Sequence, residues 1–167
     1  MQLKIGDLVV HPAFGMGRIA QLTEKSFSQQ EADLFYQVVR SRESMWIRVG
    51  AEEATGLRLV TAKNALDHYR DVLKSSPVAL NINHRQRQLD LISRLNQGSF
   101  QSVCEGMRDL TAWGWHDPLD RADMTTLQKT RDSLSQEWAA AADVSITEAI
   151  GEIDFLLLTQ RNAPILG

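Results

Sequence analysis

The stretch of residues 3–19 most constrains what this chain can fold into. Leu8-Val9-Val10 is a short apolar run with β-branched side chains, which is typical of a strand, and a second such run follows after a turn. Pro12 ends the first run, because it has no N–H to donate to a neighbouring strand. Gly15 and Gly17 allow backbone conformations that other residues avoid, so the chain can reverse sharply there. The stretch predicts two antiparallel strands joined by a tight turn.

The rest of the first sixty residues continues in the same way. Their strand-like segments are Ile19–Leu22, Phe35–Val39, Met45–Val49 and Leu57–Val60. The polar segment Ser26–Asp33 between the first two predicts a long hairpin loop. Five short strands in sixty residues predict a small, strongly bent barrel of the Tudor or SH3 type.

From residue 61 onward the apolar residues recur every three or four positions, which indicates helices. The helices are expected at 61–74, 84–95, from 100 to about 110, 120–142 and 145–158. Leu89, Ile92 and Leu95 share one face of the second helix, and we expect that face to be buried. Asp120 and Ser145 are predicted N-caps, Gly98 a helix stop, and Trp113–Pro118 a loop. The predicted fold is therefore α+β, with a β-barrel domain at 1–60 and an all-helical domain at 61–167.

Composition limits the function classes. Of the 167 residues, 43% are hydrophobic, no apolar run approaches the roughly 18 residues of a membrane span, and no signal-peptide pattern begins the chain. The lone cysteine, Cys104, excludes an internal disulfide framework, so we expect a buried thiol and a cytoplasmic protein. The net charge is −3, and residues 1–62 and 63–142 each balance acids against bases. Any contact with DNA must therefore come from a local patch.

Several short strings resemble one family. Gly6-Asp7, Val9-Val10-His11-Pro12 and Gly15-x-Gly17-x-Ile19 resemble the opening of the CarD/CdnL family of bacterial transcription regulators, whose small domain also occurs in the transcription-repair coupling factor. In the helical part, Leu95-x-x-Gly98 and Met107-Arg108-Asp109-Leu110 are similar to the family's glycine stop and Arg-Asp-Leu helix. The resemblance spans about residues 3–155.

The resemblance implies a regulator without chemistry of its own. In this family the barrel binds the β subunit of RNA polymerase, and the helical domain touches promoter DNA at the upstream edge of the transcription bubble and stabilises the open complex. The polymerase-contacting basic positions fall on Lys25 and Arg48. Strand alternation places Arg48 on the face opposite Ile47 and Val49.

On the DNA side the sequence departs from the family. Where many members carry Asn-Trp-Ser-Arg-Arg, this chain reads Asn83-His84-Arg85-Gln86-Arg87, so a histidine replaces the tryptophan that wedges into the minor groove. The candidate DNA contacts are His84, Arg85, Arg87 and Arg94, and their binding would be weak and salt-sensitive. The alternative is a polymerase-binding protein-interaction adaptor that has lost contact with DNA.

Nothing in the sequence indicates catalysis or a cofactor. The four histidines have no metal-ligand spacing with Cys104 or with carboxylates, so no metal site is expected. A small enzyme with His84 or His116 as general base is the remaining rival, and it requires a cleft with a partner acid. Trp113 and Trp115 are expected to fold back onto the helices rather than to anchor a partner. The oligomeric state is undetermined, and a monomer is the default expectation.

Overall fold

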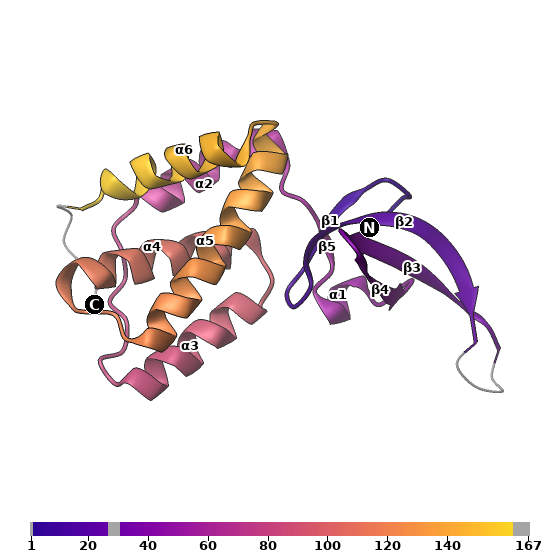
Figure 1. Cartoon of the computed structure of the whole chain (residues 1–167), viewed down its shortest axis with the longest axis horizontal. Helices are drawn as coiled ribbons and strands as arrows, with labels where there is room; N and C mark the ends of the chain where they lie inside the picture. The colour runs from indigo at the N-terminus through magenta and orange to yellow at the C-terminus, as the bar shows by residue number, and fades with distance from the viewer. Residues whose placement is uncertain (1, 27–30, 162–167) are drawn as a thin grey trace. The chain divides into compact units, whose positions relative to one another are not determined.

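The computed structural model describes residues 2–26 and 31–161. The chain divides into two compact units, Met1–Val60 and Thr61–Gly167 (Figure 1). Part of the predicted hairpin loop Ser26–Asp33 lies outside the described residues. None of the helices in the described ranges combines the length and apolarity needed to cross a membrane.

The first unit is a five-stranded antiparallel sheet with the strand order β4-β3-β2-β1-β5. The strands are β1 (Leu8–His11), β2 (Gly15–Lys25), β3 (Asp33–Arg40), β4 (Glu43–Arg48) and β5 (Arg58–Leu59). A short helix, α1 (Glu52–Thr55), which the sequence analysis did not predict, joins β4 to β5. A β module followed by helices confirms the predicted α+β fold class.

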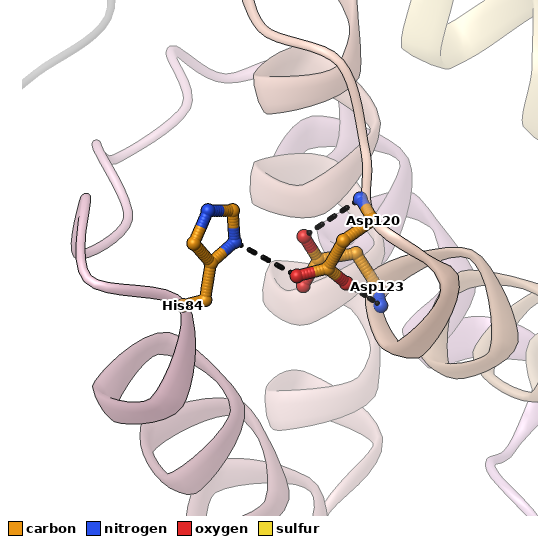
Figure 2. Close-up of side chains that lie close together, drawn as sticks. All are labelled: His84, Asp120 and Asp123. Carbon is orange, nitrogen blue, oxygen red and sulfur yellow. Dashed lines mark hydrogen bonds and ion pairs between the residues drawn. The ribbon is translucent and has the colours of Figure 1, made fainter.

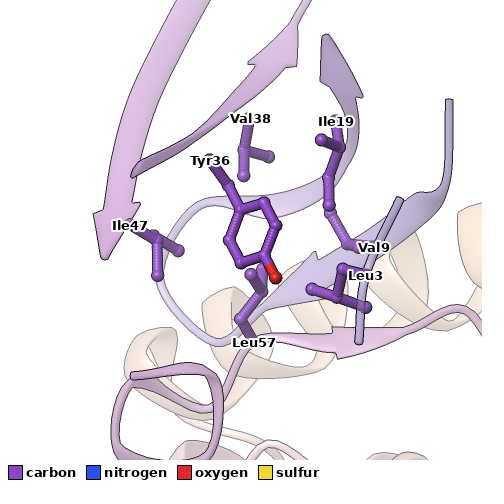
Figure 3. Packing of buried hydrophobic residues seen from close by; sticks show 7 residues of the cluster. All are labelled: Leu3, Val9, Ile19, Tyr36, Val38, Ile47 and Leu57. Atoms are coloured by element: carbon purple, nitrogen blue, oxygen red, sulfur yellow. The ribbon is translucent and has the colours of Figure 1, made fainter. Parts of the chain in front are cut away.

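One apolar core lies inside the bend of this sheet (Figure 3). It consists of Leu3, Val9, Ile19, Tyr36, Val38, Ile47 and Leu57. The register between β2 and β3 shifts between Ile19 and Gln21, which is the irregularity expected where a long strand bends. A Cβ at Gly17 would lie 2.9 Å from Cγ1 of Val38, so only glycine allows β2 to pack this closely.

The turn between β1 and β2 is organised by His11. Its Nδ1 accepts hydrogen bonds from the backbone N–H groups of Ala13 and Phe14, each at 3.1 Å. Gly15 follows with a φ of +85°, in the left-handed region that favours glycine. The predicted tight turn is confirmed, and His11 has a structural role in it. Partial burial lowers the pKa of His11, which keeps Nδ1 available as an acceptor.

The second unit is helical. After a 3₁₀ turn, η1 (Lys63–Ala65), come α2 (Leu66–Lys74), α3 (His84–Asn96), α4 (Phe100–His116), α5 (Arg121–Ala142) and α6 (Ile146–Leu158). Helix α4 packs against α2, α3 and α5, and α6 packs against α2 and α5. Its core includes the predicted buried thiol of Cys104 and the side chains of Phe100, Met107, Leu134 and Trp138.

The predicted helix boundaries with clear capping signals are confirmed. The side chains of Asp120 and Ser145 accept hydrogen bonds from the backbone N–H groups of Asp123 and Glu148. At the start of α5, Asp120 and Asp123 form a reciprocal capping box. Gly98 ends α3 with a φ of +79°.

The predicted loop at Trp113–Pro118 is wrong, because α4 continues through both tryptophans to His116. Gly114, within this segment, is a packing residue of the helix. A Cβ at this position would lie 3.2 Å from Cδ1 of Leu119, so glycine lets that side chain close against the helix. Both tryptophans are half-buried on the helix.

The prediction that the Leu89 and Ile92 side of α3 is buried is also wrong. Leu89 and Ile92 are exposed, whereas Leu91 and Arg87 are buried. The buried side of α3 carries Leu91 and Arg87, and Arg87 forms an ion pair with Asp123 on α5.

Candidate polymerase-binding face and the head of helix α3

Strand register brings the two predicted polymerase-binding residues to one face of the sheet. Lys25 on β2 lies opposite Asp33 on β3, and Phe35 on β3 lies opposite Arg48 on β4. Since neighbouring residues on these strands, such as Ile47, point into the core, this set points to the outer face. We call the outer side of Lys25, Asp33, Phe35, Trp46 and Arg48 the cation–aromatic face. Phe35 itself is buried within it, at 8% exposure.

Both cations of this face lie beside aromatic rings. Nζ of Lys25 is 3.5 Å from the ring centroid of Trp46, and Cζ of Arg48 is 6.0 Å from that of Phe35. Nη2 of Arg48 is also 2.8 Å from Oδ2 of Asp33, and these two side chains are 60% and 50% exposed. An ion pair this open to water contributes little to stability, so Arg48 can exchange Asp33 for another carboxylate at small cost.

The sequence predicted Lys25 and Arg48 as binding residues, but it did not predict Asp33, Phe35 and Trp46 as members of the same face. The alternation of β3 was a usable signal, because Tyr36 and Val38 are apolar and so place Phe35 on the opposite side. That Lys25 lies opposite Asp33 follows from the register of β2 and β3. The sequence does not give this register, because a long loop joins the two strands.

The head of α3 is a network of charges. Nη2 of Arg87 lies 2.7 Å from Oδ2 of Asp123, and Nε lies 3.2 Å from Oδ1 of the same carboxylate. The side chains are 2% and 0% exposed, so this is a buried, two-pronged ion pair. The hydrogen bonds from Arg87 to Asp123 raise the pKa of the arginine further. The Trp113 ring covers the guanidinium at 5.5 Å.

His84 and Asp120 close the network at its exposed end (Figure 2). Nδ1 of His84 is 2.8 Å from Oδ2 of Asp120 and 2.7 Å from Nη2 of Arg87. The backbone N–H of Asp123 and the contact with His84 both lower the pKa of Asp120. The carboxylate therefore stays ionised beside the guanidinium of Arg87.

The four candidate DNA contacts have different surroundings. Arg87 lies in the interior, where a phosphate has no access, so its prediction as a surface contact needs correction. Arg94, 28% exposed, donates from Nη2 to the buried Asp109 at 3.0 Å. His84 is exposed but paired with Asp120. Arg85 is exposed and makes no ion pair with any residue in the described ranges.

His84, Asp120 and Asp123 offer ligand atoms within 4.8 Å of one another, a spacing that could hold a metal ion. The guanidinium of Arg87 contacts all three residues and supplies the positive charge itself. A second cation would be repelled by it, so the geometry fits an ion-pair network better than a metal centre. His116, at the end of α4, is exposed and the network does not include it.

The first unit matches a known protein family. The model of the CarD-like/TRCF RID domain matches residues 3–60. No curated protein matches the chain. The match covers the sheet that carries the cation–aromatic face, and for residues 61–155 the resemblance stays a prediction. Domains of this family are non-enzymatic in general. Residues 3–60 thus belong to the CarD-like family as the RNA polymerase-interacting domain shared with the transcription-repair coupling factor, and the chain is an RNA polymerase-interacting protein.

Proposed function

We propose that the chain docks on the β subunit of RNA polymerase through the cation–aromatic face. The observation that carries this proposal is the gathering of Lys25 and Arg48, from two strands, beside Trp46 and Phe35 within the matched domain. Arginine and aromatic side chains are the residues that most often dominate binding energy at protein interfaces. Arg48 also lies on β4, an edge strand, so a partner can reach the strand's outer backbone as well.

A charge-reversal experiment tests this docking. Arg48→Glu should reduce retention of the full chain by immobilised β subunit at least tenfold, and Lys25→Glu should reduce it less, since lysine forms no two-pronged carboxylate pair. Arg42→Glu is the matched control, because Arg42 is an exposed arginine in the turn between β3 and β4. Retention of Arg48→Glu equal to that of the control would refute the proposed face.

For the helical unit, the geometry favours the adaptor function over strong DNA contact. Arg87 and Arg94 are held by Asp123 and Asp109, two carboxylates whose side chains are fully buried. Releasing either arginine to a phosphate would leave a buried negative charge without its partner. The unit is therefore proposed to present a protein-binding surface rather than a phosphate-binding one.

Promoter open-complex stabilisation remains the second candidate, because Arg85 and His84 are both exposed in the first turn of α3. Helix N-termini favour phosphate groups, and two contacts there would bind DNA weakly.

Binding of the chain to upstream-fork DNA at two salt concentrations separates the two functions. An adaptor shows no binding at either concentration. A DNA-contacting regulator shows binding that weakens with salt and is lost in Arg85→Ala.

A further inference from the structure

The cation–aromatic face carries a negative charge between its two positive charges. Lys25 on β2 lies opposite Asp33 on β3, and Nη2 of Arg48 on β4 is 2.8 Å from Oδ2 of the same aspartate. Phe35, which lies opposite Arg48, is two residues after Asp33 and therefore on the same side of β3. The charges thus run positive, negative and positive across three neighbouring strands, and Asp33 lies between the two cations.

The ion pair of Asp33 with Arg48 contributes little to the fold. Both side chains are at least half exposed, and the apolar core of the unit lies on the other side of the sheet. Water screens a pair in this setting, so its contribution to the free energy of folding is small. The carboxylate of Asp33 therefore affects the availability of Arg48 more than it affects the stability of the sheet.

The same pair shows what a partner group must overcome at Arg48. A carboxylate already binds this guanidinium at the distance of a charge-assisted hydrogen bond. An acidic group of a partner must either displace Asp33 or share the guanidinium with it. Displacement breaks the existing pair, and sharing places two negative charges side by side where the interface excludes water. Both routes lower the affinity that Arg48 can provide.

We propose that Asp33 is an internal competitor: it holds Arg48 in the free chain and weakens docking on an acidic group of the polymerase β subunit. This inference rests on the docking function proposed above and adds the residue that sets its affinity. A single carboxylate from a partner gains little over Asp33 at this position. The competitor therefore favours partners that add further contacts, and it disfavours acidic surfaces that offer charge alone.

Neutralising Asp33 tests the competitor. Asp33→Asn keeps the shape of the side chain and removes its charge, so the full chain should bind purified β subunit about three- to tenfold more tightly than the wild type. The Tm should stay nearly unchanged, since the lost pair is exposed. Asp33→Glu keeps the negative charge and should show no such gain. Equilibrium titration of β subunit with each variant measures these affinities.

A matched control separates the position of the charge from the net charge of the chain. Glu24 is exposed and adjoins Lys25, but it lies opposite Leu34, on the other side of the sheet from the cation–aromatic face. Glu24→Gln changes the net charge by the same amount, and its gain in affinity should stay below about twofold. Raising the salt concentration should reduce the advantage of Asp33→Asn over the wild type, because salt screens exposed charges.

The outcomes distinguish this inference from the docking function. If Arg48→Glu loses retention while Asp33→Asn binds no better than Glu24→Gln, the docking face stands and the competitor role is wrong. Weaker binding of Asp33→Asn than of the wild type would also overturn it, because Asp33 would then position Arg48 for the partner. If Arg48→Glu is retained as well as Arg42→Glu, the docking face and the competitor role are both wrong.

Discussion

Two arginine–carboxylate pairs of this chain have the same chemistry and opposite surroundings. Arg48 and Asp33 form a pair on the sheet that is open to water, whereas Arg87 and Asp123 form one inside the helical unit. Water screens the first pair and can replace either member, so Arg48 is available to a partner. Water cannot replace a member of the second pair, because both side chains are buried. Arg87 is therefore a structural residue that a partner cannot reach. Exposure, rather than residue type or spacing, separates an arginine that is available to a partner from a structural one.

Removing Arg87 is expected to have the largest effect. Arg87→Ala leaves the carboxylate of Asp123 buried without its cation, which should lower the free energy of unfolding by about 3–5 kcal/mol. Urea denaturation of the full chain measures this loss. The matched control is Arg85→Ala, which changes an exposed arginine two residues earlier and should shift stability by less than about 0.5 kcal/mol. Equal losses of unfolding free energy in Arg87→Ala and Arg85→Ala would contradict the distinction between buried and exposed arginines.

Arg94 tests the intermediate case. Its partner Asp109 is buried but also accepts hydrogen bonds from Arg108 Nε at 2.8 Å and from the backbone N–H of Val78 at 2.9 Å. Asp109 therefore keeps a cation and a backbone donor in Arg94→Ala, whereas Asp123 in Arg87→Ala keeps only the neutral donors of Gln88 and the Asp120 backbone. We expect a loss of about 1–2 kcal/mol for Arg94→Ala by the same denaturation. A loss as large as that of Arg87→Ala would show that burial of the carboxylate alone decides the cost.

The smallest effect on stability is expected for Arg48. Arg48→Ala removes an exposed pair, so the free energy of unfolding should change by less than about 1 kcal/mol while retention by the β subunit falls. Thermal unfolding and the retention assay, run on the same preparation, check both halves of this prediction. Retention lost in parallel with stability would mean that Arg48 acts through the fold and not through contact.

The pH dependence of stability tests the role of His11 in the first unit. The pKa of His11 is lowered by burial, so the unfolded chain binds its proton more readily than the folded chain does. Stability of this unit should therefore fall as the pH drops below the unfolded value of about 6.5, and it should be fully retained above that value. His11→Asn, whose side-chain oxygen can accept from the same turn, should lose this part of the pH dependence. An unchanged profile would contradict the role assigned to His11.

Local patterns in the sequence were enough for much of the fold. The Pro12 and Gly15 turn, the N-caps at Asp120 and Ser145 and the stop at Gly98 depend on groups within four residues of one another, so the sequence shows them directly. The alternation around Ile47 likewise predicted that Arg48 faces outward, as it does. For the binding face, the sequence supplied Lys25 and Arg48 as candidates but not the aromatic rings beside them.

Only the tertiary structure decided which side chains are available. Apolar periodicity predicted that Leu89 and Ile92 are buried, yet the other face of α3 lies inward, where Arg87 pairs with Asp123, thirty-six residues away. Gly114 lies in the segment predicted as a loop, but it belongs to α4, and the side chain of Leu119 packs against it. The first outcome depends on a contact between two helices, and the second on the loop after α4 folding back onto its own helix. The free energy of burying a charge depends on whether a partner of opposite charge, distant in sequence, lies beside it. Spacing along the chain determines where helices and strands form, and packing between them determines which charges remain in water.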